Sequence, residues 1–314
     1  MSARPRTGSS ALAEVDVVTV TYRSAATLPE AVELLVLQPS VRVIVVDNAS
    51  DDSTRDVIST LPVEAIELAV NGGFAHGCNV GVAVGSAPYI LLLNPDARLG
   101  HEALRTLVAA LDQDERGGAA APRIVESDGS LHFSLRRFPR LRSTFAQALF
   151  LHRLLPNAPW VDEVIRDRAQ YDRAHAVEWV SGACLLVRRS LLEQIGGLDE
   201  SFFHYSEDVD LCARIWEAGY EVRFVPRASA SHDGGASAPR TALLAILAAS
   251  RIRYSAKHDR PVVTLLVRLG VALGAVTHAI AARGGWPSRC GHLRALAVAL
   301  KPLPAEPSRL VRGR

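Results

Sequence analysis

The sequence has few cysteines and no pattern that groups them. Its four cysteines, Cys78, Cys184, Cys212 and Cys290, form neither a Cys-x-x-Cys pair nor a Cys/His cluster within 314 residues. A disulfide scaffold and a structural zinc site are therefore both disfavoured, and a reducing, cytoplasmic location is expected. No signal peptide is recognisable either, because the chain begins with a polar stretch, residues 1–13, which we expect to be disordered.

Net charge is almost absent from the whole chain, at +2, but not from its parts. Residues 1–239 hold 22 basic and 31 acidic side chains, whereas residues 240–314 hold 13 basic and 2 acidic ones. The resulting balances of −9 and +11 predict an acidic or neutral body with a basic tail that meets an anionic partner.

The basic tail lacks the interleaved aromatic residues of a nucleic-acid site, so no nucleic acid is expected as its partner. An apolar run at residues 262–282 favours a membrane surface instead. Arg268 and His278 interrupt this run, which favours an interfacial helix over a spanning one. A tail that packs on the core with a solvated basic face is the alternative.

Strand-like apolar runs alternate with helical segments along most of the chain. We expect strands over 15–20, 41–46, 64–69, 89–93, 119–124, 179–187 and 220–225, and helices over 27–37, 52–60, 74–84, 101–111, 189–195 and 207–218. This alternation predicts an α/β protein with a mostly parallel, doubly wound sheet. Ligands bind such sheets at the carboxyl ends of the strands. One cleft is therefore expected to be lined by Thr21, Tyr22, Asp47, Asn94 and Asp96.

Two of the motifs at these strand ends suit a nucleotide. Asp47 can accept a hydrogen bond from a base or a ribose hydroxyl, or it can simply form the turn. The glycine-dense segment 71–81 begins a helix, where free amide groups can approach a diphosphate. Close packing of that helix on the sheet would also need glycine, and both can hold together. The spacing is not Gly-x-Gly-x-x-Gly, which disfavours a Rossmann dehydrogenase.

Three further groups suit catalysis. Asp96 follows a hydrophobic strand and can bind a divalent cation, or it can cap the next helix. Segment 206–210 holds three carboxylates at a helix start, where the helix dipole and mutual repulsion shift pKa values in opposite directions, as a general base needs. Ordinary acids of a first helical turn are the alternative. His232, in an expected loop, is either solvated or a cation ligand with a partner such as Asp96.

In their order, these motifs resemble inverting family 2 glycosyltransferases, and within that family bacterial rhamnosyltransferases of the cell-wall linker and O-antigen type. The resemblance spans about residues 15–258 and rests on Val-Val-Asp-Asn-Ala-Ser, Asn-Gly-Gly-Phe-Ala, Leu-Asn-Pro-Asp, Ser-Gly-Ala-Cys-Leu-Leu-Val-Arg-Arg, Gly-Gly-Leu-Asp-Glu-Ser-Phe-Phe and Ser-Glu-Asp-Val-Asp-Leu. It implies the nucleotide-diphospho-sugar transferase (GT-A type) fold. The catalytic domain would be 14–239, with a nucleotide-binding half at 14–125 and an acceptor half at 126–239, followed by the helical tail 240–314.

The same resemblance implies a role for each matched residue. Asp208 is expected as the general base with Glu207 as its neighbour, and Asp96 and His232 as ligands of a divalent cation, Mg²⁺ or Mn²⁺. Asn94 stands where many relatives have aspartate, which weakens a site for a hard cation. The nucleotide sugar is expected to contact Thr21, Tyr22, Asp47, Asn71, Gly72, Gly73, Phe74, Asn79, Asn94 and Asp96.

The activity that the resemblance implies is transfer of a sugar with inversion. The expected donor is dTDP-L-rhamnose, and the expected acceptor is a hydroxyl of a glycan or of a polyprenyl-diphosphate-linked sugar. The tail would hold the enzyme on the cytoplasmic face of the cell membrane. Two alternatives stay open: a UDP-hexose donor with another acceptor, and a non-catalytic nucleotide-binding module.

Overall fold

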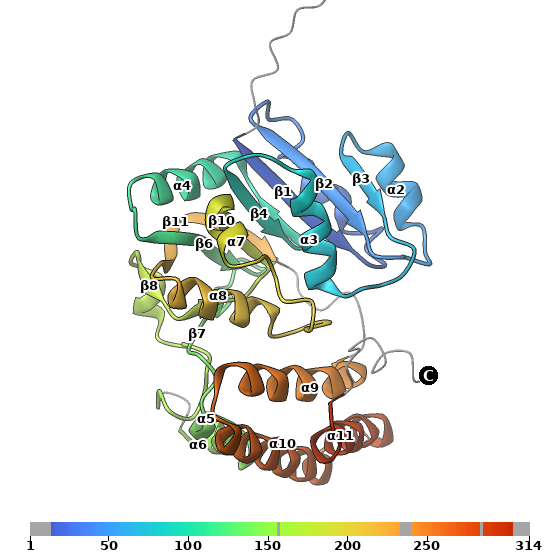
Figure 1. The fold of residues 1–314 in the computed structure, drawn as a ribbon, viewed down its shortest axis with the longest axis vertical. Helices are drawn as coiled ribbons and strands as arrows, with labels where there is room; N and C mark the ends of the chain where they lie inside the picture. Colours follow the sequence, from blue (N-terminus) through green and yellow to red (C-terminus); the bar gives the residue numbers. More distant parts are fainter. Residues whose placement is uncertain (1–13, 156–157, 233–239, 283–284, 304–314) are drawn as a thin grey trace, which may run out of the picture.

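The computed structural model of the protein describes residues 14–155, 158–232, 240–282 and 285–303. The expected disorder of 1–13 concerns a segment outside the described residues. A sheet flanked by helices forms one part of the molecule, and a bundle of C-terminal helices lies beneath it (Figure 1).

The described residues form one nine-stranded mixed sheet. Its main order is β3 (Glu64–Glu67), β2 (Val41–Asp47), β1 (Val15–Thr21), β4 (Tyr89–Leu93), β10 (Cys184–Arg188), β6 (Gly117–Val125), β11 (Glu221–His232) and β5 (Ala97–Leu99), and β8 (His175–Val177) pairs with β11. The strands β3, β2, β1 and β4 run parallel, as do β6 and β11. The α/β prediction is therefore confirmed, with an antiparallel β10 between the two parallel parts that alternation alone did not reveal.

Helices cover both faces of this sheet. On one face, α1 (Leu28–Val32) and α4 (His101–Asp112) pack against alternate residues of the central strands. On the other face, α3 (Phe74–Val84), α7 (Arg189–Gln194) and α8 (Glu207–Glu217) pack against the residues in between. Buried positions on both sides of β1, β2 and β4 explain their continuous apolar runs.

The single strand expected over 179–187 is wrong. The chain forms β9 (Trp179–Val180), which pairs with β7 (Leu135–Arg136), and then breaks before β10. Gly182 lies in the break, where an added Cβ would be 3.1 Å from the Cβ of Asp208. The close approach of α8 to this point is a tertiary contact that no local pattern encodes.

The expected end of the last strand at Val225 is also wrong. β11 continues to His232 through a register shift between Val225 and Ser229, next to Pro226. Its last residues pair with β5, a short strand that was not foreseen. His232 therefore ends a strand and does not lie in a loop.

The remaining described helices include one between β2 and β3, those of the middle segment and those of the C-terminal bundle. They are α2 (Thr54–Thr60), α5 (Leu141–Ala148), α6 (Leu151–Leu154), the 3-10 helix η1 (Arg168–Tyr171), α9 (Arg240–His258), α10 (Pro261–Ala281) and α11 (Gly285–Leu300). The helices α9, α10 and α11 pack on one another, and α10 also packs on α5 (Figure 1).

The first tail helix, α9, is attached to the part that contains the sheet, as expected for a tail that packs on the core. Ser250 donates a hydrogen bond to the backbone oxygen of His204 over 2.9 Å, and Lys257 Nζ lies 2.6 Å from Asp199. The helix α10 differs, because only 17% of its most apolar stretch is buried. By length and composition alone, α10 could also cross a membrane, so the expectation of an interfacial helix stays a prediction.

Candidate active site

The ends of β1 and β2 bring Thr21 and Asp47 together. The two residues are register partners in parallel strands, and Thr21 Oγ1 lies 3.3 Å from Asp47 Oδ1. Asp47 Oδ2 accepts hydrogen bonds from the Ser50 amide over 3.1 Å and from Arg55 Nε over 3.0 Å. Asp47 therefore forms the turn after β2, which was one of the two roles expected of it, and its side chain is fully buried. Tyr22, the next residue of this edge, lies under the guanidinium of its chain neighbour, 5.3 Å from the ring centroid.

Three amides of the glycine loop before α3 already donate within the protein, and contact of this loop with a diphosphate stays a prediction. The amides of Gly72 and Gly73 donate to the side-chain oxygens of Asn48 and Asn71 over 2.9 and 3.0 Å. The amide of Phe74 donates to the backbone oxygen of residue 203 over 2.9 Å. The loop is held rigidly at the sheet edge by neighbouring side chains.

Glycine is nevertheless required in this segment. Gly73 has φ +94°, and a Cβ there would lie 2.4 Å from the Phe203 backbone oxygen. Gly77 and Gly81 pack α3 so closely on β1 that added Cβ atoms would lie 2.6 Å from Val20 and 2.5 Å from a neighbouring valine. The packing alternative is therefore confirmed for these two glycines.

Asn79 connects α3 to the segment that leads into α8. Its Oδ1 accepts the Leu198 amide over 2.9 Å, while its Nδ2 donates to the Leu198 carbonyl over 2.8 Å and to Glu200 Oε1 over 2.9 Å. Because these bonds occupy both polar atoms of its side chain, the contact with substrate expected of Asn79 would have to compete with them. Asn79 therefore fixes α3 to the segment around Leu198 and Glu200.

Asp96 and His232 meet, although 135 positions of chain separate them in the printed numbering. The register pairs His232 with Ala97, the residue after Asp96, and His232 Nε2 lies 3.1 Å from Asp96 Oδ1. Asp96 does not cap a helix, since α4 begins five residues later and its N-cap is Gly100. His232 Nδ1 is buried without a hydrogen-bond partner among the described residues.

The carboxylates at the start of α8 occupy different surroundings. Asp208 Oδ2 accepts the Gly182 amide over 3.1 Å, and burial raises the pKa of Asp208 although three backbone amides and the charge of Arg136 oppose the rise. Burial, and then the charge of Asp208, raise the pKa of Glu207 well above its usual value. One oxygen of Glu207 has no hydrogen-bond partner among the described residues.

Asp210 faces the tail and not the sheet edge. Although burial opposes the effect, hydrogen bonds from His258 and Lys257 and the charge of Arg214 hold the pKa of Asp210 below its usual value. The three basic groups lie 2.8 Å from its carboxylate oxygens. Asp210 is therefore a structural anchor.

A continuous series of contacts joins the expected base to the expected cation ligands. Asp208 accepts the amide of Gly182, and the carbonyl of the next residue, Ala183, accepts the Asn94 amide over 2.9 Å. Asn94 in turn begins the turn that ends at Ala97, with Asp96 inside it. The start of α8, the break before β10 and the end of β4 thus meet at one edge, as Figure 1 lets the reader follow.

Sequence reasoning missed Arg136, which lies at this edge. Its guanidinium is 5.4 Å from the ring centroid of Trp179, across the β7–β9 pair, and its charge lowers the pKa of Asp208. The segment that holds Arg136 carries many arginines without a periodic pattern, so no signal distinguished this one. Asn48 was also missed, although it directly follows Asp47 in the same polar run.

Backbone strain gathers beside these groups. Of the described residues other than glycine, five have positive φ, and four of these flank the site: Arg23 after β1, Ala49 after β2, and Tyr205 and Ser206 before α8. Such conformations cost free energy and persist where the surrounding structure imposes them, as at ligand sites.

Known proteins match most of the chain. Residues 16–196 match the family model described as Glycosyl transferase family 2, and residues 168–257 match that of Glycosyl transferase family 21. An N-acetylglucosaminyl-diphospho-decaprenol L-rhamnosyltransferase of Mycobacterium tuberculosis is 32% identical over 259 residues, which cover 78% of this chain and 84% of that protein. Rhamnosyltransferase WbbL of Escherichia coli is 31% identical over 168 residues, which cover 51% of this chain and 60% of that protein.

Solved structures share the fold. The mannosyltransferase PcManGT of Pyrobaculum calidifontis, solved with GDP-Man and Mn²⁺, has a TM-score of 0.56 at 20% identity and covers 96% of this chain and 86% of its own. S. aureus TarS 1-349 has a TM-score of 0.54 at 14% identity, covering 95% of this chain and 82% of its own. These likenesses confirm the expected GT-A type fold.

Proposed function

This chain belongs to glycosyl transferase family 2, and from that premise we propose that it transfers L-rhamnose from dTDP-L-rhamnose to a polyprenyl-diphosphate-linked sugar, with inversion. The observation that carries the proposal is the series of contacts between Asp208 and the pair Asp96 and His232. The names of the two rhamnosyltransferase relatives support the sugar, and the name of the mycobacterial one supports the lipid-linked acceptor. The proposed catalytic domain is 14–239, with the tail after it.

Asp208 is the proposed general base. Burial raises its pKa, so its carboxylate holds a proton more readily than a solvated aspartate does, as a base that takes a proton from an acceptor hydroxyl must. The bond from the Gly182 amide fixes the orientation of one oxygen. A base on one side of the sugar and a diphosphate on the other require a single displacement, which inverts the anomeric centre.

A divalent cation fits beside Asp96 and His232. Their facing donor atoms are 3.1 Å apart, close to the spacing of about 3 Å between adjacent ligands of an octahedral ion with bonds of about 2.1 Å. Only one carboxylate is offered, because position 94 is asparagine, so we expect the donor diphosphate to supply further oxygens. When bound, the ion would neutralise charge that develops on the leaving diphosphate.

Thr21, Tyr22 and Asp47 are the proposed contacts of the nucleoside, since they end the strands next to β4. Asn71, Gly72, Gly73 and Phe74 are proposed to shape the neighbouring wall, although the amides of the last three already donate within the protein. The tail is proposed to bring the enzyme to the cytoplasmic face of the membrane, where a lipid-linked acceptor lies.

An assay that compares three nucleotide-sugar donors tests this proposal. Purified enzyme would be given dTDP-L-rhamnose, UDP-glucose or UDP-galactose with a polyprenyl-diphospho-N-acetylglucosamine acceptor, with and without Mg²⁺ or Mn²⁺, and the product lipid would be identified by mass spectrometry. We expect transfer only from dTDP-L-rhamnose and only with a metal ion. Transfer only from a UDP-hexose would support the other donor class and reject the rhamnosyl assignment.

A further inference from the structure

One side of α10 carries an apolar stripe that the described residues leave uncovered. The opposite side packs on α5, α9 and α11. The exposed apolar side chains are those of Val262, Leu265, Leu266, Leu269, Val276 and Ile280, which at about 100° per residue fall within about 100° of one another around the helix. At a rise of about 1.5 Å per residue, this α10 stripe is about 27 Å long. An exposed apolar surface of that extent marks an interaction site.

A pocket lies on the other side of α10 from the stripe, near the end of the helix. It is a cavity of about 330 Å³, within the range of ligand sites. With about 100° per helical residue, His278 and Ala281 lie about 160° and 100° around α10 from the middle of the stripe. The residues that line this pocket come from α6, α10 and α11, namely Phe150, Arg153, His278, Ala281, Ala282 and His292.

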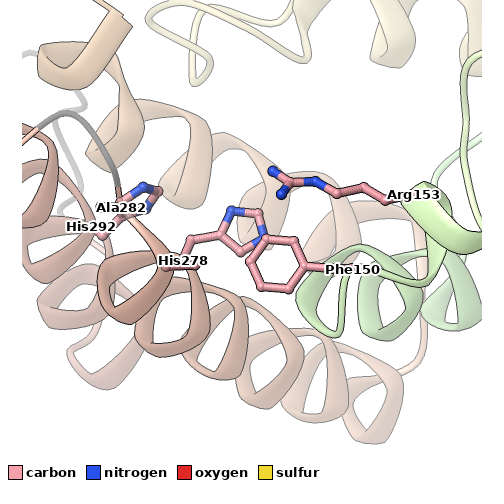
Figure 2. Close-up of a pocket in the computed structure, with 6 residues that line it drawn as sticks. Phe150, Arg153, His278, Ala282 and His292 are labelled. Carbon is pink, nitrogen blue, oxygen red and sulfur yellow. The ribbon is translucent and has the colours of Figure 1, made fainter.

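The pocket is built from a cationic aromatic cluster. The rings of Phe150 and His278 are stacked with centroids 4.3 Å apart, and the guanidinium carbon of Arg153 lies 4.6 Å from the Phe150 centroid. His292 meets His278 edge-on at 5.6 Å. Figure 2 shows Arg153 reaching over this stack from the α6 side.

Hydrogen bonding limits which groups of this cluster can donate. His278 Nε2 lies 3.2 Å from the backbone oxygen of Gln147 and donates to it, so Nδ1 of the neutral ring is an acceptor and donates to a phosphate only when the ring is protonated. Within the described ranges, no acidic side chain lines the pocket or forms an ion pair with Arg153. A guanidinium without a carboxylate partner suits a phosphate, whose oxygens accept its charge-assisted hydrogen bonds.

We propose that this pocket, here named the phosphate pocket, binds the phosphate of an anionic membrane phospholipid while the α10 stripe lies in the acyl-chain boundary. An interfacial helix places its apolar side about 5–10 Å into that boundary, which brings the opposite flank to the level of the lipid phosphates. The proposal goes beyond the sugar transfer, because the pocket shares no residue with the candidate active site.

Charge favours a lipid over a second copy of the chain as the occupant. Residues 240–314 carry 13 basic and 2 acidic side chains, so two such tails would repel each other when their α10 stripes met. An anionic bilayer complements both parts of the surface: the stripe meets hydrocarbon and the basic side chains meet headgroups. The phosphate pocket then adds recognition of the headgroup to diffuse attraction.

The test compares two kinds of negative vesicle. Full-length enzyme would be mixed with phosphatidylcholine vesicles that contain either phosphatidylglycerol or cholesteryl hemisuccinate, a carboxylate lipid, matched in surface potential. We expect binding to the phosphate vesicles to be at least about tenfold tighter, the size of one charge-assisted hydrogen bond. Equal binding to both would overturn the proposal.

Matched variants locate the effect. Arg153→Lys keeps the charge but loses the fork of the guanidinium, and we expect it to remove most of the preference, as should Arg153→Ala. Arg294 is an exposed arginine on α11 outside the pocket. Arg294→Ala should weaken binding to both vesicles by about fivefold and keep the ratio, and Arg294→Lys should change neither. A ratio that survives in Arg153→Lys and Arg153→Ala would reject the pocket.

Other occupants give distinct results. Loss of the preference in the presence of farnesyl diphosphate or inorganic phosphate would assign the pocket to an isoprenoid diphosphate or a free anion, and not to a phospholipid. Resistance to alkaline carbonate extraction would show a spanning α10, and a dimer broken by Leu269→Asn would show a second copy; either overturns the proposal. Unchanged donor hydrolysis in all variants serves as the check of folding, because none of these residues belongs to the active site.

Discussion

Asp208 and Asp210 lie two residues apart on the same helix, yet the structure treats them in opposite ways. Asp208 faces the sheet edge, where burial without a cationic hydrogen-bond partner raises its pKa. Asp210 faces the tail, where three basic groups lower its pKa. At the start of one helix, next to a strand break, one carboxylate therefore has a raised pKa and the other forms ion pairs with the tail. The surroundings, and not the residue type, separate the two roles.

Neutralising the anchor should have the largest effect on stability. Asp210→Asn removes the fully buried charge that pairs with Arg214, Lys257 and His258, and we expect a loss of about 3 kcal/mol in the free energy of unfolding. Chemical denaturation followed by circular dichroism measures it. Asp56→Asn, an exposed acid in the first turn of α2, is the control and should change stability by less than about 0.5 kcal/mol. Equal losses of stability in Asp210→Asn and Asp56→Asn would contradict the anchoring role of Asp210.

Neutralising the proposed base should have the largest effect on turnover. Asp208→Asn is expected to lower kcat by at least about a hundredfold, while leaving KM for the donor and the unfolding midpoint close to those of the parent enzyme. Steady-state transfer assays measure this. Asp128→Asn, in an exposed turn, should keep full activity. A wild-type rate for Asp208→Asn would remove Asp208 from the base role.

The two aspartates should also separate in their pH dependence. Because the pKa of Asp208 is raised, the acid limb of kcat/KM is expected at a pH above the ordinary aspartate value of about 4, with activity increasing as the pH rises. The raised pKa of His258, due mainly to its hydrogen bond with Asp210, adds stability that is lost as the pH rises through that pKa. The lowered pKa of Asp210 adds stability that is lost as the pH falls through it. We therefore expect kcat/KM and the unfolding midpoint, each measured over the same pH range, to change at different pH values.

The smallest effect is expected from Arg136. Arg136→Gln removes a positive charge that lowers the pKa of Asp208, so the acid limb of activity should move to higher pH by a fraction of a unit. Arg136→Lys should restore the limb, since it keeps the charge. The comparison is a pH–rate profile of the three enzymes, and an unmoved limb in Arg136→Gln would mean that Arg136 does not act on the base.

Several elements could be predicted from the sequence because their causes are local. The helix over 74–84 and the strand over 89–93 have the bounds of α3 and β4, since helix periodicity and a continuous apolar run act within a few residues. Asp96 and His232 could be nominated as partners by chemistry and by resemblance. Their meeting depends on the pairing of β11 with β5, and β5 has only three residues and no sequence signal.

What the order of residues decided, then, is which groups are present: the apolar runs that build a two-sided sheet, the acids that end strands, and a tail with 13 basic side chains against 2 acidic ones. Tertiary structure decided how those groups are used. In the folded protein, the amides of Gly72 and Gly73 donate hydrogen bonds to side chains, and Asp210 of α8 faces the tail. Burial and hydrogen-bond partners come from distant segments, and they, more than chemical identity, set the reactivity of a side chain.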